Sequence, residues 1–221
     1  MKKQTLAPFE AAVFDMDGTL LYSMHIWEQL IQDFLVEQKV RPAEGLREAL
    51  RPLNMEDTAV YLKQEYGMAE TPAQIIDGIN ALALRKYEQE ASCKEGVAEY
   101  LAQLQAKGVR MVAATATDRV VAQPILEKLG LAPYFDALLT CTDEGLDKNT
   151  PEIYLRAMAA AGVSDPARCA VFEDALHCIR TVKAAGFYTV AVRDFSAAYA
   201  WDEICATADA HIDNYLELLE G

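Results

Sequence analysis

Hydrophobic positions follow two different patterns along this chain, and these patterns divide it into two parts. In the larger part, short apolar runs alternate with amphipathic segments of helical spacing. The apolar runs predict strands at residues 9–14, 109–114, 137–140, 170–172, 188–192 and 210–212. The amphipathic segments predict helices at residues 97–107, 119–129, 151–161, 175–185 and 215–219. Such alternation indicates an α/β protein whose doubly wound parallel sheet is covered by helices on both faces.

The other part lies between the first two predicted strands and shows helical spacing only. Helices are expected at residues 24–38, 44–50, 56–66 and 72–90. In the last of these, Ile75, Ile79 and Leu82 fall on one helical face. We therefore expect a small α-helical cap domain at residues 23–91, inserted into a core formed by residues 1–22 and 92–221. The hinges are expected at residues 21–23 and 90–94.

Local signals refine where two of the core helices begin. Pro151 suits the first helical position of the helix at 151–161, and Thr150 before it suits the N-cap. Asp118 suits the N-cap of the helix at 119–129. Pro124 lies inside that helix and is expected to kink it or to move its start later.

Polar side chains follow several of the predicted strands, at the point where each strand ends. Asp15 and Asp17 follow the first strand, and Thr115 follows the strand at 109–114. Lys148 lies in the loop after the strand at 137–140, and the pair Glu173 and Asp174 follows the strand at 170–172. Because the carboxyl ends of parallel strands meet at one edge of the sheet, these residues are expected to gather there.

The closely spaced Asp15 and Asp17 carry the strongest chemical signal. Two neighbouring carboxylates repel each other unless a cation or a shared proton relieves them. The pair therefore indicates a metal site, an acid and nucleophile pair, or both. Each residue by itself also has an ordinary interpretation: Asp17-Gly18 as a turn, Asp174 as a helix N-cap, and Lys148 as a solvated loop residue. Their joint occurrence at several strand ends favours function.

Taken together, these segments resemble the four motifs of the haloacid dehalogenase superfamily, in the same order. The motifs are Asp15-Met16-Asp17-Gly18-Thr19-Leu20, then Thr115, then Lys148, then Glu173-Asp174. The helical insertion resembles the cap of the subgroup that includes β-phosphoglucomutases and phosphoglycolate phosphatases. The resemblance covers nearly the whole chain and implies a Rossmann-like core.

The resemblance also implies roles for these residues. Asp15 would attack phosphorus and form an aspartyl-phosphate, and Asp17 would serve as general acid and base. Mg²⁺ would be held by Asp15, the main-chain carbonyl of Asp17 and Asp174, with help from Glu173. The implied catalytic residues are Asp15, Asp17, Thr115 and Lys148. The implied phosphate-binding residues are Gly18, Thr19, Thr115, Ala116 and Lys148.

Several departures from the subgroup's patterns bear on the reaction. Asp17 stands where dehalogenases of the superfamily lack an acid, so phosphate-ester chemistry is favoured. Trp27 stands where β-phosphoglucomutases usually carry histidine, and the stretch around Arg51 lacks their glycine and serine. We expect a phosphatase, a phosphoric monoester hydrolase; the alternatives are a sugar-phosphate mutase and a non-catalytic binding relative. The expected specificity residues are Tyr22, His25, Arg51 and Asn54.

Composition limits the partners. The chain has 221 residues and a formal net charge of −14, which argues against binding nucleic acid or an anionic membrane. No apolar run approaches the roughly 20 residues of a membrane span. The five cysteines show no Cys-x-x-Cys spacing, so we expect reduced thiols and a cytoplasmic location. The expected partner is a small-molecule phosphate ester, and the expected state is a monomer or a weak homodimer.

Overall fold

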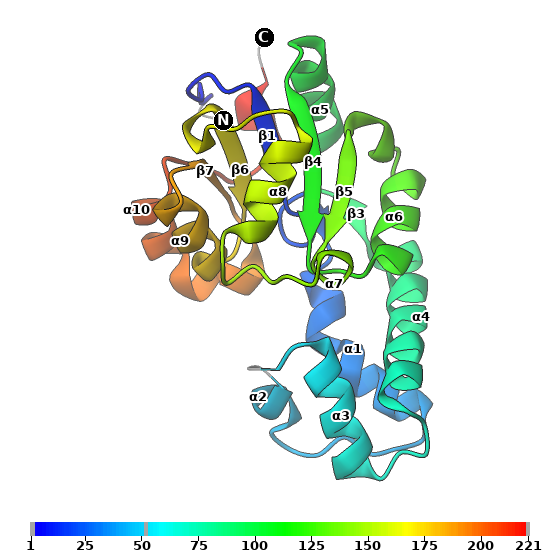
Figure 1. Cartoon of the computed structure of the whole chain (residues 1–221). Coiled ribbons are helices and arrows are strands. Elements are labelled where there is room, and N and C mark those ends of the chain that lie inside the picture. Colours follow the sequence, from blue (N-terminus) through cyan, green and yellow to red (C-terminus); the bar gives the residue numbers. More distant parts are fainter. Residues whose placement is uncertain (1–2, 51–52, 220–221) are drawn as a thin grey trace. The chain divides into compact units, whose positions relative to one another are not determined.

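The computed structural model describes residues 3–50 and 53–219, and its core is a six-stranded sheet with the order β5-β4-β1-β6-β7-β8 (Figure 1). Every pairing in this sheet is parallel. The strands are β1 (Ala11–Phe14), β4 (Arg110–Thr115), β5 (Ala137–Thr140), β6 (Cys169–Glu173), β7 (Tyr188–Val192) and β8 (Ala210–Ile212). Strand β1 lies in the middle of the sheet and is buried on both faces, which explains its uninterrupted apolar sequence.

Helices cover both faces of the sheet, so the expected doubly wound α/β fold is confirmed. The core helices are α5 (Val97–Ala106), α6 (Arg119–Lys128), α7 (Cys141–Glu144), α8 (Glu152–Ala160), α9 (Leu176–Ala184) and α10 (Trp201–Thr207). The 3-10 helices are η1 (Ala132–Tyr134), η2 (Pro166–Arg168), η3 (Phe195–Ala200) and η4 (Tyr215–Leu218). On one face, Val13 of β1 packs in a cluster with Ile153 of α8 and Val182 of α9. On the other, Phe172 of β6 contacts Tyr100 of α5 and Tyr215 of η4.

Three local expectations need correction. The N-cap of α8 is Pro151 rather than Thr150, because the Asp147 carboxylate accepts hydrogen bonds from the backbone N–H groups of Asn149 and Thr150 and fixes the preceding turn. Of the two effects expected of Pro124, a later start of α6 does not occur: the helix begins at Arg119, and Pro124 lies on its exposed side, where water can satisfy the freed carbonyl. The C-terminal helix is a 3-10 helix, η4.

Asp118 occupies the N-cap position of α6, but its side chain makes no capping hydrogen bond. Its carboxylate accepts instead from the Thr142 hydroxyl of α7. The capping prediction therefore gave the correct position and the wrong partner.

Contacts within the chain divide it into two units, one from His25 to Glu90 and one formed by the chain up to Met24 and from Ala91 onward. The helices of the first unit are α1 (Met24–Glu37), α2 (Leu46–Leu50), α3 (Met55–Tyr66) and α4 (Pro72–Glu90). Leu30, Leu62 and Ile79 are buried within it. Gly78 permits close packing there, because an added Cβ would lie 2.8 Å from the Phe34 ring.

The two chain crossings between these units pair with each other. Strands β2 (Leu21–Tyr22) and β3 (Ser92–Cys93) form an antiparallel ribbon. Two-residue strands are too short to show a period, so no hydrophobic pattern predicts this pairing. The ribbon therefore places residues of both expected hinges in the sheet-containing unit.

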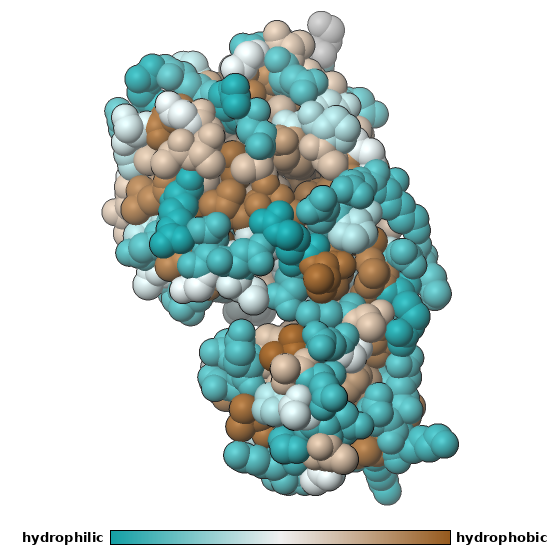
Figure 2. Space-filling model, turned by 45° about the vertical axis from the view of Figure 1, so that its right-hand side comes forward, coloured by the Kyte–Doolittle hydropathy of each residue, from teal (hydrophilic) through white to brown (hydrophobic). Residues whose placement is uncertain are grey.

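Among the described residues, no helix combines the length and the apolar character that crossing a bilayer requires. Figure 2 shows one face of the molecule, on which hydrophilic residues are mixed with hydrophobic ones.

Candidate active site

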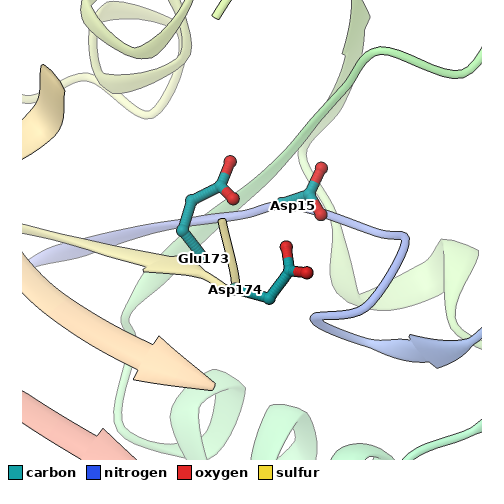
Figure 3. Close-up of side chains that lie close together, drawn as sticks. All are labelled: Asp15, Glu173 and Asp174. Carbon is teal, nitrogen blue, oxygen red and sulfur yellow. The ribbon is translucent and has the colours of Figure 1, made fainter. Parts of the chain in front are cut away.

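Three carboxylates meet at the carboxyl edge of the central strands (Figure 3). The parallel pairing of β1 with β6 sets Phe14 opposite Phe172, so the next residues, Asp15 and Glu173, leave the sheet side by side. The Asp15 N–H donates to the Phe172 carbonyl and extends this pairing by one residue. Carboxylate oxygens of Asp15, Glu173 and Asp174 lie within 4.8 Å of one another. All three residues are buried, with exposed fractions of 6%, 1% and 5%.

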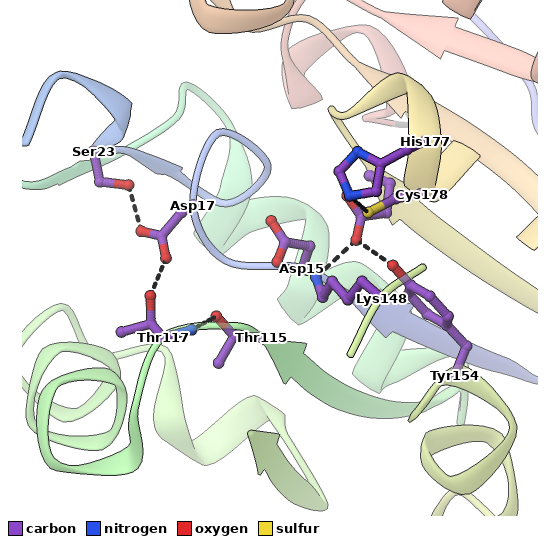
Figure 4. A network of polar contacts seen from close by, with 10 residues as sticks. Asp15, Asp17, Ser23, Thr115, Thr117, Lys148, Tyr154, His177 and Cys178 are labelled. Atoms are coloured by element: carbon purple, nitrogen blue, oxygen red, sulfur yellow. Dashed lines mark hydrogen bonds and ion pairs between the residues drawn. The ribbon is translucent and has the colours of Figure 1, made fainter. Parts of the chain in front are cut away.

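Lys148 supplies the positive charge that contacts this cluster directly. Its Nζ donates to Asp15 Oδ1 and, at 2.7 Å, to Glu173 Oε1 (Figure 4). Tyr154 of α8 donates its hydroxyl to the same Glu173 oxygen at 2.8 Å. Lys148 is itself buried, with only 8% of its surface exposed. The loop after β5 thus brings a lysine 133 positions along the chain from Asp15 onto its carboxylate.

The electrostatics of the cluster are those of an excess of negative charge. Burial raises the pKa of Asp15 to about 7, against the lowering effect of Lys148 and with a further rise from Glu173. Burial and then the neighbouring Glu173 hold the pKa of Asp174 well above its usual range. Burial disfavours the charged form of Lys148, but Asp15 and Glu173 outweigh it and raise its pKa.

This donor set fits a divalent cation. Three buried carboxylates lie together, and the Lys148 ammonium contacts two of them, Asp15 and Glu173. Hard oxygen ligands of this kind suit Mg²⁺. Burial is the main cause of the raised pKa values of Asp15 and Asp174, and a bound cation would relieve the mutual repulsion that adds to it.

The turn after β1 brings Gly18 against Asp174. A Cβ at Gly18 would lie 2.4 Å from Asp174 Oδ2, and the residue has φ +79°. Both facts require glycine here. The N–H groups of Gly18 and Thr19 donate within the turn, to the carbonyls of Leu21 and Met16. Thr19 is fully buried, and its hydroxyl has no hydrogen-bond partner among the described residues.

Asp17 is held by two hydroxyl groups on the opposite side of this turn (Figure 4). Ser23 donates to its Oδ1 and Thr117 to its Oδ2, each at 2.6 Å. The Thr115 hydroxyl accepts from the Thr117 N–H at 3.0 Å, and Ala116 between them is exposed. The sequence suggested no role for Ser23 or Thr117, because ordinary serine and threonine residues in a hinge and a loop carry no distinguishing pattern.

The structure shows which residues contact the expected specificity residues. Tyr22 is 39% exposed, and its ring lies beneath Lys94 Nζ at 5.3 Å. His25 contacts Glu90, with 3.3 Å between the ring Nε2 and a carboxylate oxygen. The Asn54 side chain caps α3 by accepting from the Asp57 N–H. Arg51 lies outside the described residues. None of these contacts tests a role in substrate selection.

Comparison with known proteins agrees with this arrangement. The chain is 28% identical to Protein CbbY of Rhodobacter capsulatus over 206 residues, which cover 86% of this chain and 90% of that protein. It is 26% identical to hexitol phosphatase B of Escherichia coli over 190 residues, which cover 82% of each. Its fold matches the crystal structure of CbbY from Rhodobacter sphaeroides in complex with phosphate, with a TM-score of 0.79 and 21% identity over 94% of this chain and 95% of that one.

A family model described as haloacid dehalogenase-like hydrolase matches residues 9–186, which include Asp15, Thr115, Lys148, Glu173 and Asp174. The family inferred from the sequence motifs is therefore confirmed, and with it the expectation of a hydrolase. The chain belongs to the haloacid dehalogenase-like hydrolases.

Proposed function

We propose that this protein is a Mg²⁺-dependent phosphatase that hydrolyses a small phosphate ester through an aspartyl-phosphate on Asp15. The observation that carries the proposal is the buried contact of Lys148 with Asp15 inside a cluster of three carboxylates. A nucleophilic carboxylate must approach an anionic phosphoryl group, and this approach needs concentrated positive charge.

In the first step, an Asp15 carboxylate oxygen forms a bond to phosphorus while the bond from phosphorus to the ester oxygen breaks. Asp17 gives a proton to the departing alkoxide. In the second step, Asp17 takes a proton from water, whose oxygen attacks phosphorus and releases Asp15 and inorganic phosphate. Lys148 holds the Asp15 carboxylate and offers its charge to the phosphoryl oxygens throughout.

Mg²⁺ bound by Asp15, the Asp17 carbonyl, Asp174 and Glu173 would supply the charge that offsets repulsion between the phosphoryl group and the carboxylates. The phosphoryl oxygens would be received by the Thr115 hydroxyl, the Ala116 N–H and Lys148. Gly18 and Thr19 would contribute through the turn that they form beside Asp174.

Two observations favour hydrolysis of a small ester. Hexitol phosphatase B, a relative that is aligned over most of both chains, is named for a phosphatase activity on a small polyol phosphate. Trp27, at the position where mutases usually carry histidine, donates its indole N–H to the Tyr87 hydroxyl within the same unit. We propose that the substrate is selected by the four residues expected from the sequence, Tyr22, His25, Arg51 and Asn54.

The test is a panel of sugar phosphates, polyol phosphates, nucleotides and phosphoglycolate, assayed with Mg²⁺ for phosphate release and for conversion between isomers. We expect phosphate release from small esters and no isomerisation. Asp15→Asn is expected to lower kcat by at least about 10³-fold, because an amide cannot replace the nucleophile. Asp213→Asn, the same change at an exposed residue paired with Arg193, is the matched control.

Three results would contradict the proposal. Equal rates for Asp15→Asn and the unaltered protein would place the activity elsewhere. Exchange between sugar-phosphate isomers without net phosphate release would identify a mutase. Binding of phosphate esters without any turnover would identify a non-catalytic relative.

A further inference from the structure

Tyr154 touches the site and lies six positions after Lys148, at the end of the stretch that carries the third motif. It lies in the first half of α8, is fully buried, and donates its hydroxyl to Glu173 Oε1 at 2.8 Å. The same oxygen accepts from Lys148 Nζ at 2.7 Å. One carboxylate oxygen thus receives two donors, one from a loop and one from a helix packed on the sheet.

The two donors differ in how firmly the fold holds them. Lys148 reaches the cluster through a flexible side chain on a loop, and ordering such a side chain costs conformational entropy. Tyr154 has only two torsions and is fixed by the packing of α8, where Ile153 and Ala157 are also fully buried.

The tyrosine also faces the lysine itself. Lys148 Nζ lies 5.7 Å from the centre of the Tyr154 ring, within the distance at which a ring face attracts a cation (Figure 4). Tyr154 therefore constrains Lys148 twice, through the carboxylate that both contact and through the ring face.

We infer that Tyr154 is a positioning residue, whose hydroxyl fixes Glu173 so that Glu173 aims the Lys148 ammonium at Asp15. In this arrangement Glu173 serves chiefly as the anchor of Lys148, since its Oε1 already accepts two hydrogen bonds. This inference rests on the proposed phosphatase function, in which Lys148 offers its charge to the nucleophile and the phosphoryl group.

The test is Tyr154→Phe, which removes one oxygen and keeps the ring. We expect kcat to fall about tenfold, the size of effect typical of losing a hydrogen bond to a charged group, while KM and the Mg²⁺ requirement stay unchanged. Tyr100→Phe is the matched control, because Tyr100 is a buried tyrosine of α5 outside the motifs. Thermal unfolding of both variants shows whether either has lost its fold.

A double-mutant cycle separates positioning from general loosening. In a Lys148→Met background there is no ammonium to position, so adding Tyr154→Phe is expected to change kcat by less than about twofold. A loss of the same size in both backgrounds, or an unchanged kcat in Tyr154→Phe, would overturn the inference. Neither result would affect the phosphatase proposal, which is tested by the Asp15→Asn comparison.

A second measurement needs no turnover. Labelling with an amine-directed acetylating reagent, quantified by peptide mass spectrometry, reports how firmly each lysine is held. We expect Lys148 to react several-fold faster in Tyr154→Phe than in the unaltered protein. The buried Lys94, paired with Asp194, serves as the internal control and should not change. Equal Lys148 labelling in both proteins would also overturn the inference.

Discussion

Among the described residues of the sheet-containing unit, two lysines are buried, and the balance of charge around them differs. Lys148 contacts Asp15 and Glu173 in a cluster of three carboxylates. Lys94 contacts a single carboxylate, Asp194, with 3.0 Å between Nζ and Oδ2, and both side chains are almost fully inaccessible. Lys94 also donates to the Arg193 carbonyl at 2.5 Å.

The difference distinguishes a candidate functional site, at Lys148, from a structural ion pair, at Lys94. At Lys94 each charge has its partner, and the pair joins the chain after β3 to the loop after β7. At Lys148 negative charge is left over, and burial with mutual repulsion raises the pKa values of Asp15 and Asp174. Folding alone does not favour such an excess, and perturbed pKa values of this kind are typical of functional sites.

The largest effect on stability is expected at the balanced pair. Lys94→Met leaves the buried Asp194 carboxylate without its counter-charge, although the N–H and hydroxyl of Ser196 still donate to it, so the free energy of unfolding should fall by about 3–5 kcal/mol. Urea denaturation checks this. The double variant Lys94→Met/Asp194→Asn should regain much of the loss, because no buried charge is left without a partner. A single variant as stable as the unaltered protein would contradict the structural role given to this pair.

At the cluster of Asp15, Glu173 and Asp174, binding of Mg²⁺ should instead raise the stability of the fold. Mg²⁺ at one hundred times its dissociation constant is expected to raise the free energy of unfolding by about 2.7 kcal/mol, since it binds only the folded cluster. The melting temperature with Mg²⁺, compared with a salt of equal ionic strength, measures this. Asp174→Asn should abolish the rise, and Asp213→Asn, at an exposed residue, should keep it. A rise that survives Asp174→Asn would place the cation elsewhere.

The smallest effect is expected in the helical unit. Asn54→Ala removes the side chain that caps α3 and should cost about 1 kcal/mol of stability. The kcat/KM for a small aryl phosphate should stay within about twofold. Thermal denaturation and steady-state kinetics check the two parts. A large change in substrate preference without a change in stability would instead support Asn54 as a specificity residue.

The sequence predicted the part of the site that depends on strand ends. Three site residues, Asp15, Thr115 and Glu173, each stand at the end of an apolar run or directly after it. Parallel pairing with little offset places such backbone positions side by side, independently of their side chains. The helical insertion was also predictable, since four segments of 3.6-residue spacing carry no strand signal. The β2–β3 ribbon was not, because two residues cannot show a period.

What the sequence by itself determined is therefore the fold class, the family and the carboxyl-edge residues of the candidate site. Only the tertiary structure decided their partners: Ser23 and Thr117 on Asp17, Tyr154 on Glu173, and Asp194 on Lys94. Thr117 and Asp17 lie 100 positions apart. The physical reason is that the hydrophobic period fixes which edge a residue reaches, whereas a hydrogen bond depends on side-chain reach and direction across elements that no local pattern encodes.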